Sequence, residues 1–299
     1  MIVEWSMEDG ITYEIVRDPR DYWKILDVMK DAWSMKDYTE AVPPHMLKAV
    51  ADNGGFLMIA RKGEEIVGFV FGFTGRDERY GFYHYSHMVG VKKAYRGKGI
   101  ALRLKLEQRK WALSQGFKLI VWTYDPHQGL NARFNFGKLG VINRRFYPDY
   151  YGEMRDGINV GVPSDRFKVE WWITSKRVID RIEGRDLPPM FDDVKDYAFF
   201  PVISGLDGDV RVVKNILLNK DKDLVLVEFP GDINFVKKID IKKAIKWKLD
   251  LREVFNFYLF HGYKVVEHIS LIENEERRNF YLLWRASLDA ILRGEYPWK

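Results

Sequence analysis

A basic turn that carries two glycines is the part of this chain best suited to chemistry. The β-rich run Phe82–Val91 leads into it, and an amphipathic helix is expected over Gly99–Gln115. The first N–H groups of a helix have no partner within it, and the helix dipole favours negative charge there. The turn therefore predicts a diphosphate site. It is not a Walker loop, because Lys98 is followed by Gly99 and not by Ser or Thr. It also lacks the third glycine of a dinucleotide fingerprint.

The spacing Arg96-x-x-Gly99-x-Ala101, between a strand and a helix, resembles the acyl-CoA loop of the GCN5-related N-acetyltransferase (GNAT) superfamily. The resemblance implies that the main-chain N–H groups of residues 96–101 face the diphosphate of acetyl-CoA and that the Arg96 side chain adds a charge contact. It implies that Val89–Val91 line the pantetheine arm, on a strand that splays from its neighbour. Gly90 fits a bulge or a close backbone approach. An ordinary helix start without a ligand is the alternative.

The strand before the loop carries the residues best able to accept a proton. Period-2 alternation places Tyr83, Tyr85 and His87 on one face and His84 and Ser86 on the other. Histidine has a suitable pKa for accepting an ammonium proton, so His87 is the predicted general base. The superfamily often has a glutamate on this strand, and none occurs here. A hydrogen-bonded structural histidine is the alternative reading of both His84 and His87.

The segment Asn131–Gly140 resembles the second cofactor segment of the superfamily. Many members carry a tyrosine four residues before the closing glycine, where it protonates the departing thiolate, and Phe136 stands at that position here. Water or one of Tyr147, Tyr150 and Tyr151 is left for this step, and Tyr147 is the predicted acid. Asn131 is a predicted cofactor residue or a helix N-cap.

The predicted site can be stated residue by residue. Its catalytic residues are His87 and Tyr147, it has no metal ligand, and acetyl-CoA is its co-substrate. The predicted cofactor-binding residues are Val89, Gly90, Val91, Arg96, Gly97, Lys98, Gly99, Ile100, Ala101 and Asn131.

Composition sets the limits of the interpretation. The chain has 299 residues, of which 46% are apolar and 15% aromatic, enough for a substantial core. It has no cysteine, which excludes disulfides, thiolate metal sites and a cysteine nucleophile. The net charge of +5 is compatible with an anionic cofactor and does not require nucleic acid. No leader and no membrane-spanning run are evident, so a soluble cytoplasmic protein is expected.

Hydrophobic periodicity predicts an α/β fold: a mixed central sheet flanked by helices, in the order βααβββαβαβ, over about residues 11–175. The expected domains are 1–178, GNAT-like, and 179–299, a C-terminal α/β unit, with Leu187–Pro189 as a linker. In the second domain a long helix over Phe235–Phe260 is expected. His261–Val266 echoes Gln115–Ile120, so this domain is either a degenerate GNAT-like half or only similar by chance.

The resemblance implies transfer of an acetyl group from acetyl-CoA to a primary amine by direct attack in a ternary complex. The acceptor is a small-molecule or peptide amine. Neither a membrane nor nucleic acid is an expected partner, and the oligomeric state, a homodimer included, stays open. Two alternatives remain: a catalytically silent CoA-binding or regulatory module, and a basic interaction protein that uses the lysine-rich stretch of residues 237–248.

Overall fold

The computed structural model describes residues 10–298, which divide into two compact units. The first comprises the chain up to Trp122 together with Arg155–Val160. The second comprises Thr123–Met154 and Gly161–Lys299. These boundaries differ from the expected domains, 1–178 and 179–299, which stay a prediction about independently folding parts.

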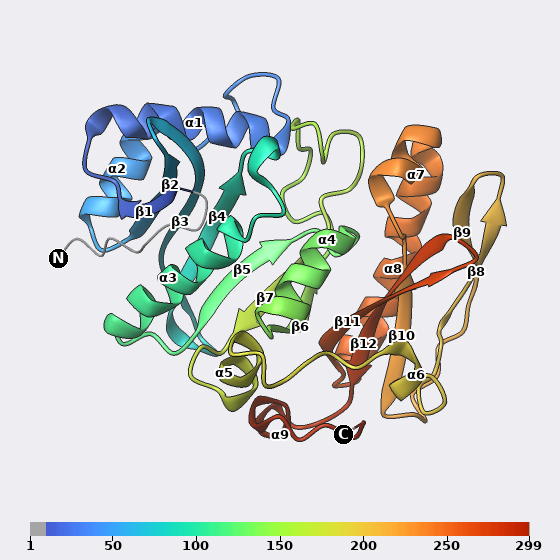
Figure 1. Ribbon diagram of the computed structural model, residues 1–299. Coiled ribbons are helices and arrows are strands. Elements are labelled where there is room, and N and C mark those ends of the chain that lie inside the picture. Colours follow the sequence, from blue (N-terminus) through green and yellow to red (C-terminus); the bar gives the residue numbers. More distant parts are fainter. Residues whose placement is uncertain (1–9, 299) are drawn as a thin grey trace. The chain divides into compact units, whose positions relative to one another are not determined.

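The first unit contains a five-stranded sheet in the order β1-β2-β3-β4-β5 (Figure 1). Neighbouring strands are antiparallel, except that β4 and β5 are parallel. The last two residues of β5 belong to the second unit. The elements are β1 (Ile11–Ile15), α1 (Pro19–Trp33), α2 (Pro44–Asp52), β2 (Phe56–Lys62), β3 (Glu65–Asp77), β4 (Gly81–Val91), the short 3₁₀ turn η1 (Lys93–Tyr95), α3 (Ile100–Ser114) and β5 (Ile120–Tyr124).

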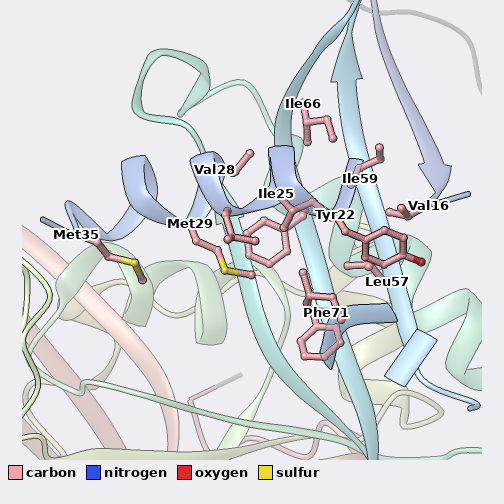
Figure 2. Packing of buried hydrophobic residues seen from close by; sticks show 13 residues of the cluster. Val16, Tyr22, Ile25, Val28, Met29, Met35, Leu57, Ile59, Ile66 and Phe71 are labelled. Carbon is pink, nitrogen blue, oxygen red and sulfur yellow. The ribbon is translucent and has the colours of Figure 1, made fainter. Parts of the chain in front are cut away.

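Side-chain alternation along β2 and β3 supplies a core on each face of this sheet. On one face, Leu57, Ile59 and Phe71 pack against Tyr22, Ile25 and Met29 of α1, whose rows of apolar side chains point down onto the strands in Figure 2. On the other face, the cluster contains Phe56, Ala60, Val67, Val70, Ile100 and Leu104, the last two from α3.

Helix α1 begins where Asp18 accepts the N–H of Arg20 and Pro19 takes the first helical position, as the Asp-Pro pair predicts.

Helix α3 buries two polar side chains beside its apolar ones. Lys105 and Gln108 are fully buried together with Ile100 and Leu104, whereas Leu102 and Leu106 are only partly buried. The reason lies on β4, whose side chains toward α3 include polar ones that need partners.

The second unit contains a sheet in the order β7-β6-β11-β12-β10 and a separate β8-β9 hairpin. Its elements are α4 (Gly129–Ala132), the π-helical turn η2 (Arg133–Lys138), β6 (Ile142–Tyr147), β7 (Arg166–Trp171), α5 (Lys176–Ile182), α6 (Phe191–Val194), β8 (Val202–Asp207), β9 (Val210–Ile216), β10 (Leu224–Phe229), α7 (Ile233–Ile239), α8 (Ile241–Phe260), β11 (Lys264–Glu273), β12 (Glu276–Trp284) and α9 (Leu288–Arg293). On β12, Phe280 packs with α6 and α9, whereas the ring of the next residue, Tyr281, contacts Phe255 of α8.

The prediction of a single long helix over Phe235–Phe260 is wrong, because the structure has two helices there. Asp240 has an extended backbone (φ −153°, ψ 108°) and ends α7. Its carboxylate accepts the N–H of Lys242 and so caps α8. An aspartate inside a long apolar pattern was the available signal.

The two glycine-capped helices also differ in how their flanking strands are arranged. Strands β4 and β5, on either side of α3, pair directly. Strands β10 and β11, on either side of α7 and α8, are separated by β12. This topology favours a chance similarity between His261–Val266 and Gln115–Ile120.

Within residues 10–298, none of the helices is both long and apolar enough to cross a lipid bilayer.

Candidate functional site

The turn before α3 presents a row of main-chain donors. Gly97 and Gly99 have φ of +79° and +78°, a region that an L side chain rarely adopts, and space around both is open. None of the N–H groups from Gly97 to Leu102 donates to an acceptor among the described residues; the first bond of the helix is Arg103 N–H to Gly99 O. Six consecutive amides at the start of a 15-residue helix therefore stay available for an anion.

Hydrogen bonds to α1 and β4 hold this turn in place. The Arg96 guanidinium donates to the carbonyl oxygens of Ala32 (2.7 Å) and Val91 (3.3 Å). The Lys93 N–H donates to the Asp31 carboxylate at 2.6 Å. These bonds use two of the five N–H donors of Arg96 to anchor the loop, and its charge contact with a diphosphate stays a prediction. The exposed Lys98 keeps a positive charge on the turn.

Strand β4 diverges from β5 beside the turn. The two strands pair only at His84–Ile120 and Tyr85–Val121, so from Ser86 onward no described strand covers this edge of β4. This agrees with the predicted splay at Val89–Val91. Main-chain groups at a bare strand edge are free to bind an extended ligand.

The bulge in β4 lies at His87 and not at Gly90. Phe71 pairs with Met88 and Gly72 pairs with Ser86, which leaves His87 as the extra residue. Gly90 stays in register, and the atoms that leave no room for a side chain there belong to aromatic rings and not, as was expected, to the backbone. A Cβ atom at Gly90 would lie 2.8 Å from the Phe69 ring and 2.9 Å from that of Trp33.

The bulge turns His87 into an aromatic environment. The imidazole lies about 6 Å, centroid to centroid, from the rings of Phe71, Phe73 and Tyr85, and the residue as a whole is exposed. Desolvation by these rings lowers the pKa of His87 below its usual value. The imidazole is therefore neutral near pH 7, the form that accepts a proton.

His84 has a structural role instead. It is fully buried against the rings of Phe56 and Trp111, and its Nε2 lies 2.9 Å from the Gln108 amide nitrogen. Burial, with a smaller effect of Lys105, lowers the pKa of His84 to about 3. The alternative interpretation of a hydrogen-bonded histidine is the one that fits His84.

A buried lysine completes this network, and sequence reasoning missed it. The Lys105 ammonium donates to Ser86 Oγ (3.0 Å) and Gln108 Oε1 (2.8 Å) and lies 3.8 Å from the centroid of the Trp122 ring. Burial lowers the pKa of Lys105 well below 10.5. The signal was a lysine three residues before a glutamine on a helix that faces two polar strand residues.

Comparison with known proteins identifies the domain that carries this turn. Residues 13–140 match the family model of the acetyltransferase (GNAT) family. Residues 13–140 form a GNAT acetyltransferase domain. The predicted resemblance and the predicted α/β fold class are thereby confirmed, with further strands and helices C-terminal to the domain.

Solved structures similar to the chain include three acetyltransferase structures. Naa50 of Arabidopsis thaliana in complex with the bisubstrate analogue CoA-Ac-MVNAL is 19% identical, with a TM-score of 0.42, and the match covers 54% of this chain and 97% of that one. The NatC complex bound to Gag peptide and CoA is 17% identical (TM-score 0.44; 55% and 99% covered). A GNAT-family acetyltransferase from Streptococcus pneumoniae is 13% identical (TM-score 0.42; 54% and 97% covered). A search of curated proteins finds no match.

The remaining predicted residues, Asn131, Phe136 and Tyr147, follow β5 in the chain. Asn131 is exposed inside α4 and is not its N-cap, because that position is Gln128. Phe136, in place of the family tyrosine, is fully buried with its ring centroid 5.7 Å from that of Tyr281. Tyr147 is half-buried at the end of β6. The roles assigned to Asn131 and Tyr147 stay predictions.

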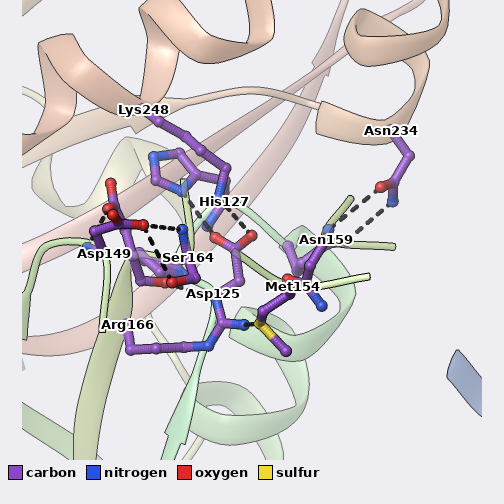
Figure 3. A network of polar contacts seen from close by, with 12 residues as sticks. Asp125, His127, Asp149, Met154, Asn159, Ser164, Arg166, Asn234 and Lys248 are labelled. Atoms are coloured by element: carbon purple, nitrogen blue, oxygen red, sulfur yellow. Dashed lines mark hydrogen bonds and ion pairs between the residues drawn. The ribbon is translucent and has the colours of Figure 1, made fainter. Parts of the chain in front are cut away.

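A buried polar network follows β5 in the second unit. As Figure 3 shows, Lys248 and His127 converge on Asp125, at 2.7 Å from Lys248 Nζ and 2.8 Å from His127 Nδ1. Burial alone would raise the pKa of Asp125, but the Lys248 charge and the His127 hydrogen bond outweigh it, so this pKa lies below its usual range. Lys248 belongs to the lysine-rich stretch of residues 237–248, but in the structure it is fully buried.

Two other lysines of this stretch weaken the interpretation as a basic interaction protein. Lys243 pairs with Asp207 and Lys246 with Asp250, both at 2.8 Å. Acidic partners offset the positive charge of this helix face.

Lys248→Met is expected to lower the free energy of unfolding by about 3–5 kcal/mol, because it leaves the Asp125 carboxylate buried without its ammonium partner. Denaturant unfolding measures this change. Lys246→Met on the same helix is the matched control, since the Lys246 side chain is 61% exposed and its loss should change little. Because the pKa of folded Asp125 is lowered, its stabilisation is complete above about pH 4, the pKa of an unfolded aspartate, and is lost below it. Equal stability of the two variants would contradict this assignment.

Proposed function

We propose that the chain is an acetyl-CoA-dependent N-acetyltransferase that acetylates a primary amine of a small molecule or peptide. The observation that carries the proposal is the row of unpaired amides from Gly97 to Leu102, at the start of α3 in a GNAT domain. Such a row fits a diphosphate, since several N–H groups and the helix dipole act on the same oxygens.

In this mechanism the amine attacks the thioester carbonyl carbon directly. The nitrogen–carbon bond forms, the carbon–sulfur bond breaks, and the thiolate takes up a proton. An N–H group at the bare edge of Val89–Val91 polarises the carbonyl oxygen, as expected for a developing oxyanion. Direct transfer also suits a chain without cysteine, which has no thiol to carry the acetyl group.

His87 accepts the proton that the amine must lose. Its lowered pKa keeps it neutral near pH 7, and its place at the β4 bulge puts it next to the bare strand edge. Tyr147 remains the predicted proton donor to the thiolate.

A second function is favoured by one observation. Phe136 fills the position of the family's tyrosine and is part of the core, so a silent CoA-binding module is the alternative.

Thiol release from acetyl-CoA, measured with a panel of amino acids, polyamines, aminosugars and peptides, separates the two. The enzyme is expected to release one thiol per acetylated amine, confirmed by mass spectrometry of the product. CoA binding without amine-dependent release would support the silent module. Absence of binding would reject both.

A further inference from the structure

A buried lysine of α3 stands at the point where β4 and β5 separate. The two parallel strands pair for the last time at Tyr85–Val121. Ser86 on β4 and Trp122 on β5 are therefore the first residues beyond the pairing. Lys105 Nζ lies 3.0 Å from Ser86 Oγ and 3.8 Å from the centroid of the Trp122 ring. One side chain of α3 thus contacts both strands where they diverge.

A second buried residue of α3 extends this contact along β4. Gln108 accepts a hydrogen bond from Lys105 Nζ at 2.8 Å, and its amide nitrogen lies 2.9 Å from His84 Nε2. On β3, Gly72 leaves the space that this imidazole needs, because a Cβ atom there would lie 2.5 Å from His84 Nε2. Helix α3 is therefore tied to β4 at two alternate residues, His84 and Ser86.

A lysine at this position costs free energy that an apolar side chain would not. The contacts above are to a hydroxyl, an amide oxygen and a ring face, which are neutral groups. Desolvation by burial lowers the pKa of Lys105 well below 10.5. Strongly perturbed groups of this kind cluster at functional sites, and a satisfied polar network rigidifies the elements that it joins.

The strand segment that this network holds leads into the candidate site. Ser86 pairs with Gly72 and is followed by His87, the extra residue of the bulge. Beyond the bulge lie Val89–Val91, at the bare strand edge. Fixing Ser86 against α3 determines which residue the bulge leaves out, and the register of the residues after it is set at the same time.

We propose that Lys105 is a positioning residue for the pantetheine arm of CoA. By binding Ser86 and packing on the Trp122 ring, it keeps β4 and β5 apart, so that the main-chain groups of Val89–Val91 stay open to the arm. Lys105 acts through these two neighbours and not by direct contact with the ligand. The inference rests on the CoA binding of the proposed function, but not on acetyl transfer.

Calorimetric titration of the full chain with CoA and with 3′-phospho-ADP tests the proposal. The second ligand is the part of CoA that keeps the diphosphate and lacks the pantetheine arm, so the ratio of the two Kd values measures the contribution of the arm. Lys105→Met should reduce this ratio by about 3- to 30-fold, the equivalent of one or two hydrogen bonds. The Kd of 3′-phospho-ADP should stay unchanged, because the amides of Gly97–Leu102 are untouched.

The outcomes separate this inference from the proposed function. An unchanged ratio in Lys105→Met, or equal weakening of both ligands, would overturn the role of Lys105 and leave the diphosphate site in place. Equal affinity of the unaltered chain for the two ligands would also overturn it, since the arm would then contribute nothing. If the unaltered chain binds neither ligand, the proposed function fails, and the role of Lys105 fails with it.

A second variant tests the contact through Ser86 and covers the case in which Lys105→Met does not fold. Ser86→Ala removes only the hydroxyl group and should lower the ratio in the same direction. The double variant should be no weaker than Lys105→Met alone, because both changes break one contact. Lys110→Met, at an exposed position of the same helix, is the matched control and should keep the ratio. Additive effects of the two changes would refute the link through Ser86.

Discussion

Replacing Gly99 by valine is expected to weaken CoA binding by roughly 10- to 100-fold. Gly99 has φ +78° at the N-cap of α3, a conformation that a β-branched residue adopts only at a cost of about 1–3 kcal/mol. The loop would relieve this strain by rotating its peptides, so the N–H groups on both sides of residue 99 would no longer point to one anion. A loss of 1.4 kcal/mol of binding free energy is about tenfold in Kd. Calorimetry with CoA measures the effect.

The control lies at the other end of the same helix. Gly116 has φ +82° and open space around it, so Gly116→Val carries a similar strain without touching the loop. Its CoA affinity should equal that of the unaltered chain. Equal weakening in both variants would mean that valine acts through global destabilisation, and unchanged affinity in Gly99→Val would reject the loop as the diphosphate site.

The loop was predictable because its chemistry is local. Whether amides are exposed at a strand-turn-helix junction depends on glycine spacing within a few residues, and the sequence displays it. The same holds for the capping of α1 by Asp18 and for the hairpin between β2 and β3 at Gly63. The order of strands and helices in the first unit followed from hydrophobic periodicity in the same way.

Features set by long-range contacts were not predictable. The bulge at His87 depends on how β4 registers with β3, and a one-residue shift leaves no trace in a single strand's sequence. The burial of Lys105 depends on Ser86, 19 residues away, and that of Lys248 on Asp125, 123 residues away. A lysine in a helix pattern predicts solvent exposure, and only a distant partner changes that outcome.

The residues of the candidate site also differ in whether local sequence or distant contacts determine their roles. Gly97–Ala101 required only local reasoning, whereas the anchoring of the loop by Arg96 depends on Ala32, on a helix far back in the sequence. A guanidinium can satisfy either anions or carbonyl oxygens, and the sequence does not say which is near.

The second large effect concerns His87. Its replacement by alanine is expected to lower kcat by about 10²- to 10⁴-fold with little change in CoA affinity, because general-base catalysis acts in the transition state and the loop amides are untouched. The pH dependence of kcat is expected to follow the protonation of His87. Desolvation beside the aromatic rings lowers the pKa of His87, so kcat should hold as pH falls through 6.5 and decline only at lower pH, where the imidazole becomes protonated.

Steady-state rates of thiol release between pH 5 and 9, with the best acceptor of the amine panel, measure this profile. In His87→Ala the acidic limb should disappear along with most of the rate, since the titrating group is gone. His45→Ala is the matched control: it removes an exposed histidine of α2 and should keep both rate and profile. If His87→Ala keeps both the rate and the acidic decline of kcat, a group other than His87 accepts the proton of the amine. The bare edge of β4 would then polarise the thioester without a general base on the same strand.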